Sequence, residues 1–154
     1  MKVAGSVVVV TGGASGLGRA TVEKLVAAGA KVAIFDFNEA AGEAVVAALG
    51  DAVIFKKVNV ADEESVQAAI AATAEHFGAI HVCINYAGIG SATKTLGKKG
   101  VFPLAEFNRV LQVNLVGTFN VLRYAAEQMA KNEIVDGERG VIINTASIAA
   151  YEGQ

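Results

Sequence analysis

The sequence predicts an α/β fold in which five parallel strands form a doubly wound sheet with helices on both faces. Three observations support this prediction. Short β-branched apolar runs alternate with amphipathic segments along all 154 residues, which is typical of βαβ units. The 17 glycines gather near the ends of these segments. A single proline is present, so almost nothing interrupts the elements. Right-handed crossovers then give the strand order 3-2-1-4-5.

The first half of the chain contains three strand–helix units. The predicted strands cover residues 7–10, 31–35 and 53–60. The helices that follow them cover residues 16–28, 38–49 and 62–77. Asn38 and Asp62 have the short polar side chains that cap helix N-termini, and Gly29 is a helix stop. The buried face of the first helix is assigned to Ala20, Leu25 and Ala28.

The second half has longer segments. A fourth strand covers residues 80–85 and leads into a loop, residues 88–101, that is rich in glycine, lysine and threonine. A long helix is predicted over residues 104–132, and the fifth strand over 141–144. Phe107 and Phe119 have roughly helical spacing and are expected in the core or at a subunit interface.

Composition excludes several function classes. With 13 basic and 15 acidic residues the net charge is -2, which argues against a nucleic-acid partner. One cysteine excludes a disulfide framework, and His76 and His81 fit no metal-ligand spacing, so no metal is expected. The apolar run at residues 7–10 is too short for an export signal, and no run is long enough to cross a membrane. We therefore expect one domain, residues 1–154, in a cytoplasmic protein.

A glycine-rich turn separates the first strand from the first helix. Gly12 permits a tight turn, Gly16 lets the backbone approach a pyrophosphate, and Gly18 lets the helix pack on the sheet. The amides at the helix start, around Ser15 and Leu17, then face the anion. The alternative is a glycine-rich turn that binds no ligand.

Asp36 ends the second strand, eighteen residues after Gly18. A carboxylate at this place accepts hydrogen bonds from an adenosine ribose and repels a 2′-phosphate, which favours NAD over NADP. Arg19 is the alternative cation for a 2′-phosphate, but its place in the helical pattern is on the surface. The alternative for Asp36 is a solvated acid at a strand end.

The spacing of Thr11-Gly12-x-x-x-Gly16-x-Gly18 resembles the short-chain dehydrogenase/reductase family, whose domains are Rossmann-like. Further motifs agree in order. Asn85-Tyr86-Ala87-Gly88 resembles the family's Asn-Asn-Ala-Gly, with Tyr86 as the departure, and Asn59-Val60 stands where the family has Asp-Val beside the adenine. The resemblance implies a set of coenzyme contacts, namely Gly12, Ser15, Gly16, Leu17, Gly18, Asp36, Asn59, Val60, Asn85, Tyr86, Ala87 and Gly88.

The resemblance also implies a catalytic set. Asn114 matches the helix asparagine that positions a proton-relay water, and Ser147 matches the serine that orients the substrate oxygen. The family's base and its helper are a Tyr-x-x-x-Lys pair, which none of the three tyrosines here forms. Tyr151 follows Ser147 too closely to be the base, and it is assigned with Gln154 to the substrate mouth. These 154 residues are therefore expected to be the N-terminal portion of a longer dehydrogenase, with the fifth strand left as an apolar sheet edge.

A narrower resemblance concerns the loop at residues 91–100 and the run at 140–154. Both look like the type II 3-hydroxyacyl-CoA dehydrogenases, a branch that also oxidises hydroxysteroids and 2-methyl-3-hydroxyacyl thioesters. Lys94, Lys98 and Lys99 are then candidates to meet CoA phosphates, although a solvated loop explains the lysines alone. Family likeness further implies a homotetramer built partly through the long helix.

Two other functions compete with an NAD-dependent dehydrogenase of hydroxyacyl-CoA substrates. One is a truncated, non-catalytic NAD-binding or oligomerisation module, in which Asn114 and Ser147 have no role. The other is a methyltransferase-like domain, which does not explain why Asp36 and Ser147 both fall at dehydrogenase positions.

Overall fold

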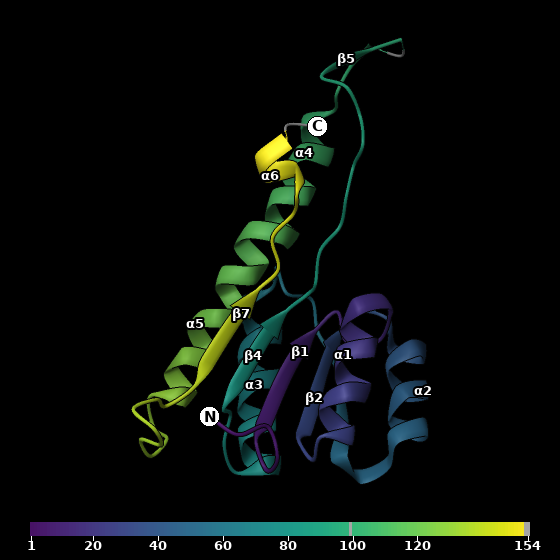
Figure 1. The fold of residues 1–154 in the computed structure, drawn as a ribbon. Helices are drawn as coiled ribbons and strands as arrows, with labels where there is room; N and C mark the ends of the chain where they lie inside the picture. The colour runs from purple at the N-terminus through teal and green to yellow at the C-terminus, as the bar shows by residue number, and fades with distance from the viewer. Residues whose placement is uncertain (99, 153–154) are drawn as a thin grey trace.

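Five parallel strands form the central sheet of the computed structural model, which describes residues 1–98 and 100–152 (Figure 1). They are β1 (Val7–Thr11), β2 (Lys31–Asp36), β3 (Val53–Lys57), β4 (Val82–Asn85) and β7 (Val141–Asn144). Their order across the sheet is β3-β2-β1-β4-β7. Because β7 is the fifth strand of this sheet along the chain, the predicted order 3-2-1-4-5 and the predicted fold class are confirmed.

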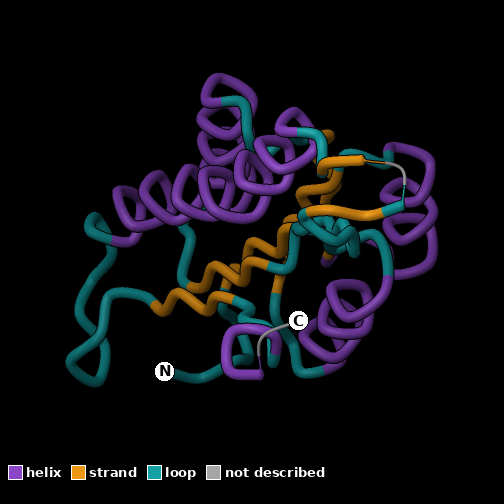
Figure 2. Tube along the Cα trace, turned by 90° about the horizontal axis from the view of Figure 1, so that it is seen from above, coloured by secondary structure: helices purple, strands orange, loops and turns teal. Residues whose placement is uncertain are grey.

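Helices cover both faces of the sheet (Figure 2). The covering helices are α1 (Gly16–Ala27), α2 (Glu39–Leu49), α3 (Glu63–Phe77) and α5 (Thr118–Met129), with a 3₁₀ turn η1 (Gly50–Ala52) after α2. Two further helices, α4 (Leu104–Leu111) and α6 (Ala149–Glu152), lie beyond the carboxyl end of the sheet in Figure 1. The predicted caps are present: Asn38 Oδ1 accepts from the Ala41 N–H at 3.1 Å, and Asp62 Oδ1 accepts from the Ser65 N–H at 2.7 Å.

The core has two halves, one on each side of the sheet. Val22 of α1 and Val45 of α2 pack on one face, and Ile70 of α3 and Val121 of α5 pack on the other. Every residue of β1 is buried between them. A strand covered on both faces needs a continuous apolar run rather than an alternating one, and the four consecutive valines of β1 supply it.

The buried face of α1 differs from the predicted one. Val22 is fully buried, whereas Ala20 and Ala28 are exposed and Leu25 is half-buried. The helix packs on the sheet through Gly18 and Val22, four residues apart on one face, and the glycine contact rotates that face away from Ala20.

The third strand is shorter than predicted and ends at Lys57 rather than at residue 60. Its ladder partner β2 ends at Asp36, which is paired with Lys57, so no strand remains for the following residues to pair with. Val58, Asn59 and Val60 therefore lie in a loop at the carboxyl edge of the sheet.

The predicted helix over residues 104–132 consists of three consecutive segments and ends at Met129. Between α4 and α5 lies η2 (Gln112–Gly117), a π-helical segment that contains Asn114. Such segments are rare and frequently occur at functional sites. Two further elements were not predicted: the hairpin β5 (Leu96–Gly97) with β6 (Gly100–Val101), which projects away from the sheet in Figure 1, and α6.

One face of the long helix carries large apolar side chains that are exposed. This apolar helix face consists of Leu104, Phe107, Leu111, Leu115 and Phe119. Phe107 is 48% exposed and Phe119 is 60% exposed, so neither belongs to the core of this chain. Within the part of the chain that the structure describes, no helix combines the length and apolar character needed to cross a membrane.

Candidate functional site

The glycine-rich turn joins β1 to α1 at the carboxyl edge of the sheet. Gly12 and Gly16 have φ values of +65° and +53°, a backbone region that side chains other than glycine rarely adopt. A Cβ at Gly18 would overlap the carbonyl group of Gly12, so only glycine lets the helix start this close to the turn. The turn is thereby held open toward the first turn of α1, whose N–H groups lack helical partners.

Thr11 and Tyr86 connect the ends of β1 and β4 beside this turn. Thr11 Oγ1 accepts from the N–H groups of Tyr86 and Ala87 at 3.1 and 3.0 Å. The Tyr86 hydroxyl lies 3.2 Å from that of Thr21 on α1. Tyr86, which stands in place of the second asparagine of the family motif, therefore adds a side-chain contact between the end of β4 and α1.

Asp36 stands across the turn at the end of β2. Its Oδ2 accepts from the Ala14 N–H at 3.1 Å, and its Oδ1 accepts from the Asn38 N–H at 3.0 Å. These two bonds fix the plane of the carboxylate between the glycine-rich turn and the start of α2. Each oxygen keeps a further lone pair for a ligand hydroxyl.

Asn59 and Val60 lie beside Asp36 in the loop after β3. Asn59 Oδ1 accepts from the Ala61 N–H at 3.1 Å, and the Asn59 N–H donates to Ser65 Oγ at 3.2 Å. The amide side chain is thus oriented by its own loop, while Val60 is 7% exposed and anchors the loop in the core.

These features surround a cavity of about 680 Å³. Of the twelve residues predicted to contact the coenzyme, eleven line it: Gly12, Ser15, Gly16, Leu17, Gly18, Asp36, Asn59, Val60, Tyr86, Ala87 and Gly88. Asn85 does not; it is 4% exposed, and its Nδ2 donates to Asn144 Oδ1 of the neighbouring strand at 2.9 Å. Its side chain joins β4 to β7 beneath the site.

Seven lining residues were not predicted: Phe35, Phe37, Val58, Ile89, Arg109, Val113 and Thr145. Four of them are next in the sequence to predicted residues, so the sequence could have indicated them: Phe35, Phe37, Val58 and Ile89. Arg109 and Val113 come from α4 and η2, which only the folded chain brings to this edge. Arg109 is bound by Glu106 at 2.7 Å, and that pairing lowers the pKa of the Glu106 carboxyl and raises the pKa of Arg109.

The predicted catalytic residues lie outside this cavity lining. Asn114 Oδ1 accepts from the Ile89 N–H and its Nδ2 donates to the Ile89 carbonyl, each at 2.8 Å, so the amide is clamped on the loop after β4. Ser147 is exposed, and its Oγ accepts from the Ala149 N–H at 3.2 Å at the start of α6. The structure shows no hydrogen bond between these two side chains.

The other predicted substrate residues are exposed or lie outside the described part of the chain. The Tyr151 side chain is 86% exposed on α6. Gln154 and Lys99 lie outside the described residues. Lys94 and Lys98 are exposed, in the segment that leads into the hairpin and in its turn.

The remaining reactive side chains have structural surroundings. Cys83 is fully buried in β4, and burial raises the pKa of its thiol to about 12. His81 Nδ1 accepts from the Val7 N–H at 3.0 Å, at the opposite edge of the sheet from the cavity, and His76 is exposed. Across residues 1–98 and 100–152, no three His, Cys, Asp or Glu side chains are grouped as metal ligands.

Comparison with known proteins places this geometry in a family. The profile described as short chain dehydrogenase matches residues 6–154. The chain belongs to the short-chain dehydrogenase family. Membership confirms the resemblance on which the sequence assignments rest, and it implies a nicotinamide dinucleotide as coenzyme.

Individual relatives narrow the position within the family. The chain is 50% identical to the human 3-hydroxyacyl-CoA dehydrogenase type-2 over 156 aligned residues, which cover 99% of this chain and 60% of the relative. It is 42% identical to a 2,5-dichloro-2,5-cyclohexadiene-1,4-diol dehydrogenase of Sphingobium indicum, covering 97% of this chain and 57% of the relative. The chain thus spans about 60% of the length of these curated relatives.

A solved structure agrees with the fold. The crystal structure of 3-hydroxyacyl-CoA dehydrogenase type-2 from Mycobacterium avium superposes with a TM-score of 0.88 at 39% identity, covering 97% of this chain and 59% of that one. The chain is therefore a member of the short-chain dehydrogenase family that is similar in sequence and fold to type-2 3-hydroxyacyl-CoA dehydrogenases.

Proposed function

We propose that this chain is the coenzyme-binding part of an NAD-dependent dehydrogenase that transfers a hydride between NAD(H) and a secondary alcohol or ketone, with a 3-hydroxyacyl-CoA as substrate. One observation carries the proposal: the glycine-rich turn and the Asp36 carboxylate face one cavity at the carboxyl edge of the sheet. Its volume, about 680 Å³, falls within the range typical of ligand sites. Open α/β sheets bind their ligands at this edge.

The lining of the cavity suits the pyrophosphate, the ribose and the adenine of a dinucleotide. The N–H groups at the start of α1 bind the pyrophosphate, helped by the positive end of the helix dipole. Asp36 accepts from the ribose hydroxyls, and Asn59 and Val60 border the adenine. Tyr86, Ala87 and Gly88 border the cavity on the β4 side.

NAD rather than NADP is supported by the local charges. The Asp36 carboxylate would repel a 2′-phosphate. The nearby cations already have carboxylate partners: Arg19 Nε lies 2.9 Å from Glu23, Arg109 lies 2.7 Å from Glu106, and Nζ of Lys57, the ladder partner of Asp36, lies 2.9 Å from Glu39. No free cation among these residues remains to balance two further negative charges.

The chemical step needs a hydride acceptor, which the nicotinamide ring supplies when bound. Ser147 donates to the substrate oxygen, and Asn114 holds the loop after β4 and positions a water for proton relay. Tyr151 and Gln154 border the substrate. Within 154 residues no tyrosine is followed by lysine at the family's spacing, so the base is assigned to residues outside this sequence.

The assembly proposed is a cytoplasmic homotetramer. The apolar helix face supports it, because five large side chains exposed along one helix surface are favourable only when another surface covers them. Substrate is the other proposed partner, with no nucleic acid and no membrane.

The proposal is tested by reduction of acetoacetyl-CoA with NADH, followed at the absorbance of NADH. The intact gene product should turn over, and the 154 residues alone should bind NADH without turnover. An intact product that binds NADH and reduces no thioester would instead favour the non-catalytic NAD-binding or oligomerisation module. An intact product that does not bind NADH would contradict both.

A further inference from the structure

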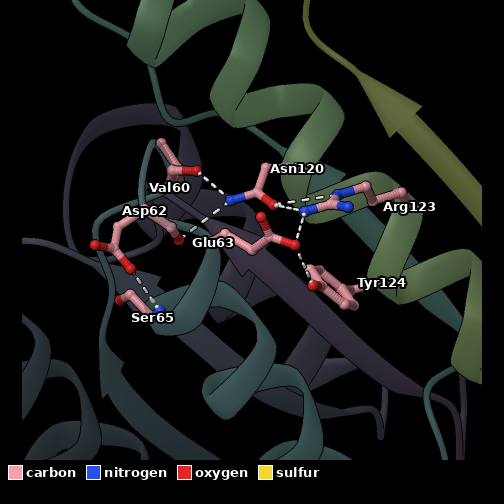
Figure 3. Close-up of polar contacts among 7 residues, drawn as sticks. All are labelled: Val60, Asp62, Glu63, Ser65, Asn120, Arg123 and Tyr124. Atoms are coloured by element: carbon pink, nitrogen blue, oxygen red, sulfur yellow. Dashed lines mark hydrogen bonds and ion pairs between the residues drawn. The ribbon is translucent and has the colours of Figure 1, made fainter.

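A buried asparagine on α5 holds the loop that borders the adenine end of the cavity. Asn120 is 6% exposed. Its Nδ2 donates to the Val60 carbonyl at 2.9 Å and to the Asp62 carbonyl at 3.2 Å (Figure 3). One side chain therefore satisfies two carbonyl groups on the loop between β3 and α3.

Arg123 determines which way the Asn120 amide points. The Asn120 Oδ1 accepts from Arg123 through Nε at 3.3 Å and through a terminal nitrogen at 2.9 Å. A guanidinium has donors and no acceptor, so the amide must present its oxygen to Arg123 and its NH₂ group to the loop. A flipped amide would place its NH₂ group against these donors and its oxygen against two carbonyls.

Glu63 and Tyr124 hold the guanidinium in turn. The Glu63 carboxylate lies 2.8 Å from the Arg123 terminal nitrogen and accepts from the Tyr124 hydroxyl at 2.8 Å (Figure 3). The bonds from Arg123 and Tyr124 lower the pKa of Glu63, and the bond to Glu63 raises the pKa of Arg123. Both groups are ionised across the neutral range. The hydrogen bonds from Arg123 to Asn120 Oδ1 therefore persist at neutral pH.

A second contact joins the same helix to the same loop. A Cβ at Gly117, where η2 meets α5, would lie 2.6 Å from Cγ2 of Val60. The helix backbone is therefore in close contact with the Val60 side chain, while Asn120 binds its carbonyl. The loop residues Asn59 and Val60 in turn line the cavity.

We propose that Asn120 is a positioning residue that fixes the adenine subsite. This inference rests on the proposed function, since it assigns the loop after β3 to the adenine. The last backbone bond from this segment to β2 runs from the Val58 N–H to the Asp36 carbonyl at 2.9 Å, and the two bonds donated by Asn120 hold the following loop at the carbonyls of Val60 and Asp62. The selective prediction is that Asn120 controls binding of the adenosine half of the coenzyme and not of the nicotinamide half.

The test is Asn120→Asp in the intact gene product, titrated calorimetrically with AMP and, separately, with reduced nicotinamide mononucleotide. The substitution preserves shape and replaces the two donated bonds by repulsion between oxygens. Losing hydrogen bonds of ordinary strength should weaken AMP binding about tenfold, with reduced nicotinamide mononucleotide changed by less than about twofold. Asn108→Asp, the same change at an exposed position on α4, should alter neither.

Arg123→Met provides a second variant, because Arg123 is half-exposed and its loss leaves Asn120 in place but free to turn. It should weaken AMP binding in the same direction by about threefold, since the reoriented amide loses part of its bonding. If AMP affinity is unchanged in both variants, or if both half-ligands weaken equally, Asn120 is not a positioning residue for adenine. If the unsubstituted protein does not bind NADH, the proposed function fails, and the adenine assignment fails with it.

Discussion

Candidate functional side chains near the glycine-rich turn are held by bonds within the chain, whereas those near the C-terminus are largely exposed. Around the glycine-rich turn, candidate residues have partners within the chain: Asp36 accepts from two backbone N–H groups, and Asn59 is bonded to its own loop. Near the C-terminus, Tyr151 is 86% exposed and the apolar helix face is bare. Ser147 is also exposed, and its hydroxyl oxygen accepts from the Ala149 N–H at the start of α6.

The difference separates two kinds of site. A site built from a turn, a strand end and a loop of one sheet edge is preorganised when the sheet forms, and its residues lie early in the sequence. A site that needs a base and a covering surface from elsewhere is incomplete in these residues. The comparison therefore predicts that substitutions in the first region alter coenzyme affinity directly, whereas those on the apolar helix face of the second region alter assembly.

The largest effect is expected from Gly18→Val in the intact gene product. The new side chain would overlap the Gly12 carbonyl, so either the turn or α1 must move away from the pyrophosphate position. We expect NADH affinity to fall more than about 100-fold, measured by fluorescence titration, which corresponds to about 3 kcal/mol. Gly90→Ala is the control, since its Cβ would meet no atom within 4 Å and it should bind NADH normally. Unchanged affinity in Gly18→Val would remove the turn from the site.

Asp36→Ala should have the next largest effect. Charged hydrogen bonds of about 1.5–3 kcal/mol are lost, so NADH affinity should fall about 10- to 100-fold. NADPH should lose less or gain, because repulsion of the 2′-phosphate is removed. Isothermal titration with both coenzymes measures the ratio. An equal loss for the two would show that Asp36 only supports the turn.

The pH dependence of the free energy of unfolding tests whether Cys83 is buried in the core beneath the site. Burial raises the pKa of its thiol to about 12, above the ordinary value of 9.0, so the native state keeps the proton that the unfolded chain releases. The stabilisation is complete below about pH 9 and is lost as pH rises toward 12, at about 1.4 kcal/mol per pH unit. Urea unfolding at several pH values measures it. Cys83→Ala should be less stable at neutral pH and should lack this component of the slope; an identical slope would contradict a buried thiol.

The smallest effect on coenzyme binding is expected from Leu115→Glu, on the apolar helix face. Because Leu115 is 64% exposed in the single chain, the charge is tolerated in the monomer and destabilises only a surface that covers it. Light scattering should show a smaller assembly, with NADH affinity changed less than about twofold. Leu96→Glu, at a 72% exposed leucine of the hairpin, is the matched control. A tetramer that survives Leu115→Glu would place the interface elsewhere.

Sequence reasoning succeeded where the signal is local. The valine run of β1, the caps Asn38 and Asp62, and the glycine-rich turn each encode their own conformation within a few residues. The strand order was predicted from the alternation of strands and helices with right-handed crossovers, and the structure confirms it. Eleven of the twelve residues assigned to the coenzyme by motif spacing line one cavity, and their contact with a coenzyme stays a prediction.

Sequence reasoning failed where the determinant is tertiary. The phase of α1 is fixed by the approach of Gly18 to Gly12, and the length of β3 by the end of β2. The π-helical segment preserves the helical residue pattern closely enough to look like continuous helix. Asn120 contacts a loop about sixty residues earlier in the chain, and no periodicity in its own helix indicates that partner.

The most direct test of the account is a crystal structure of the intact gene product with NAD bound. The account predicts the pyrophosphate against the N–H groups at the start of α1, with the adenosine ribose hydroxyls on the Asp36 carboxylate and the adenine beside Asn59 and Val60. Coenzyme found at any other edge of the sheet, or with its ribose away from Asp36, would contradict it.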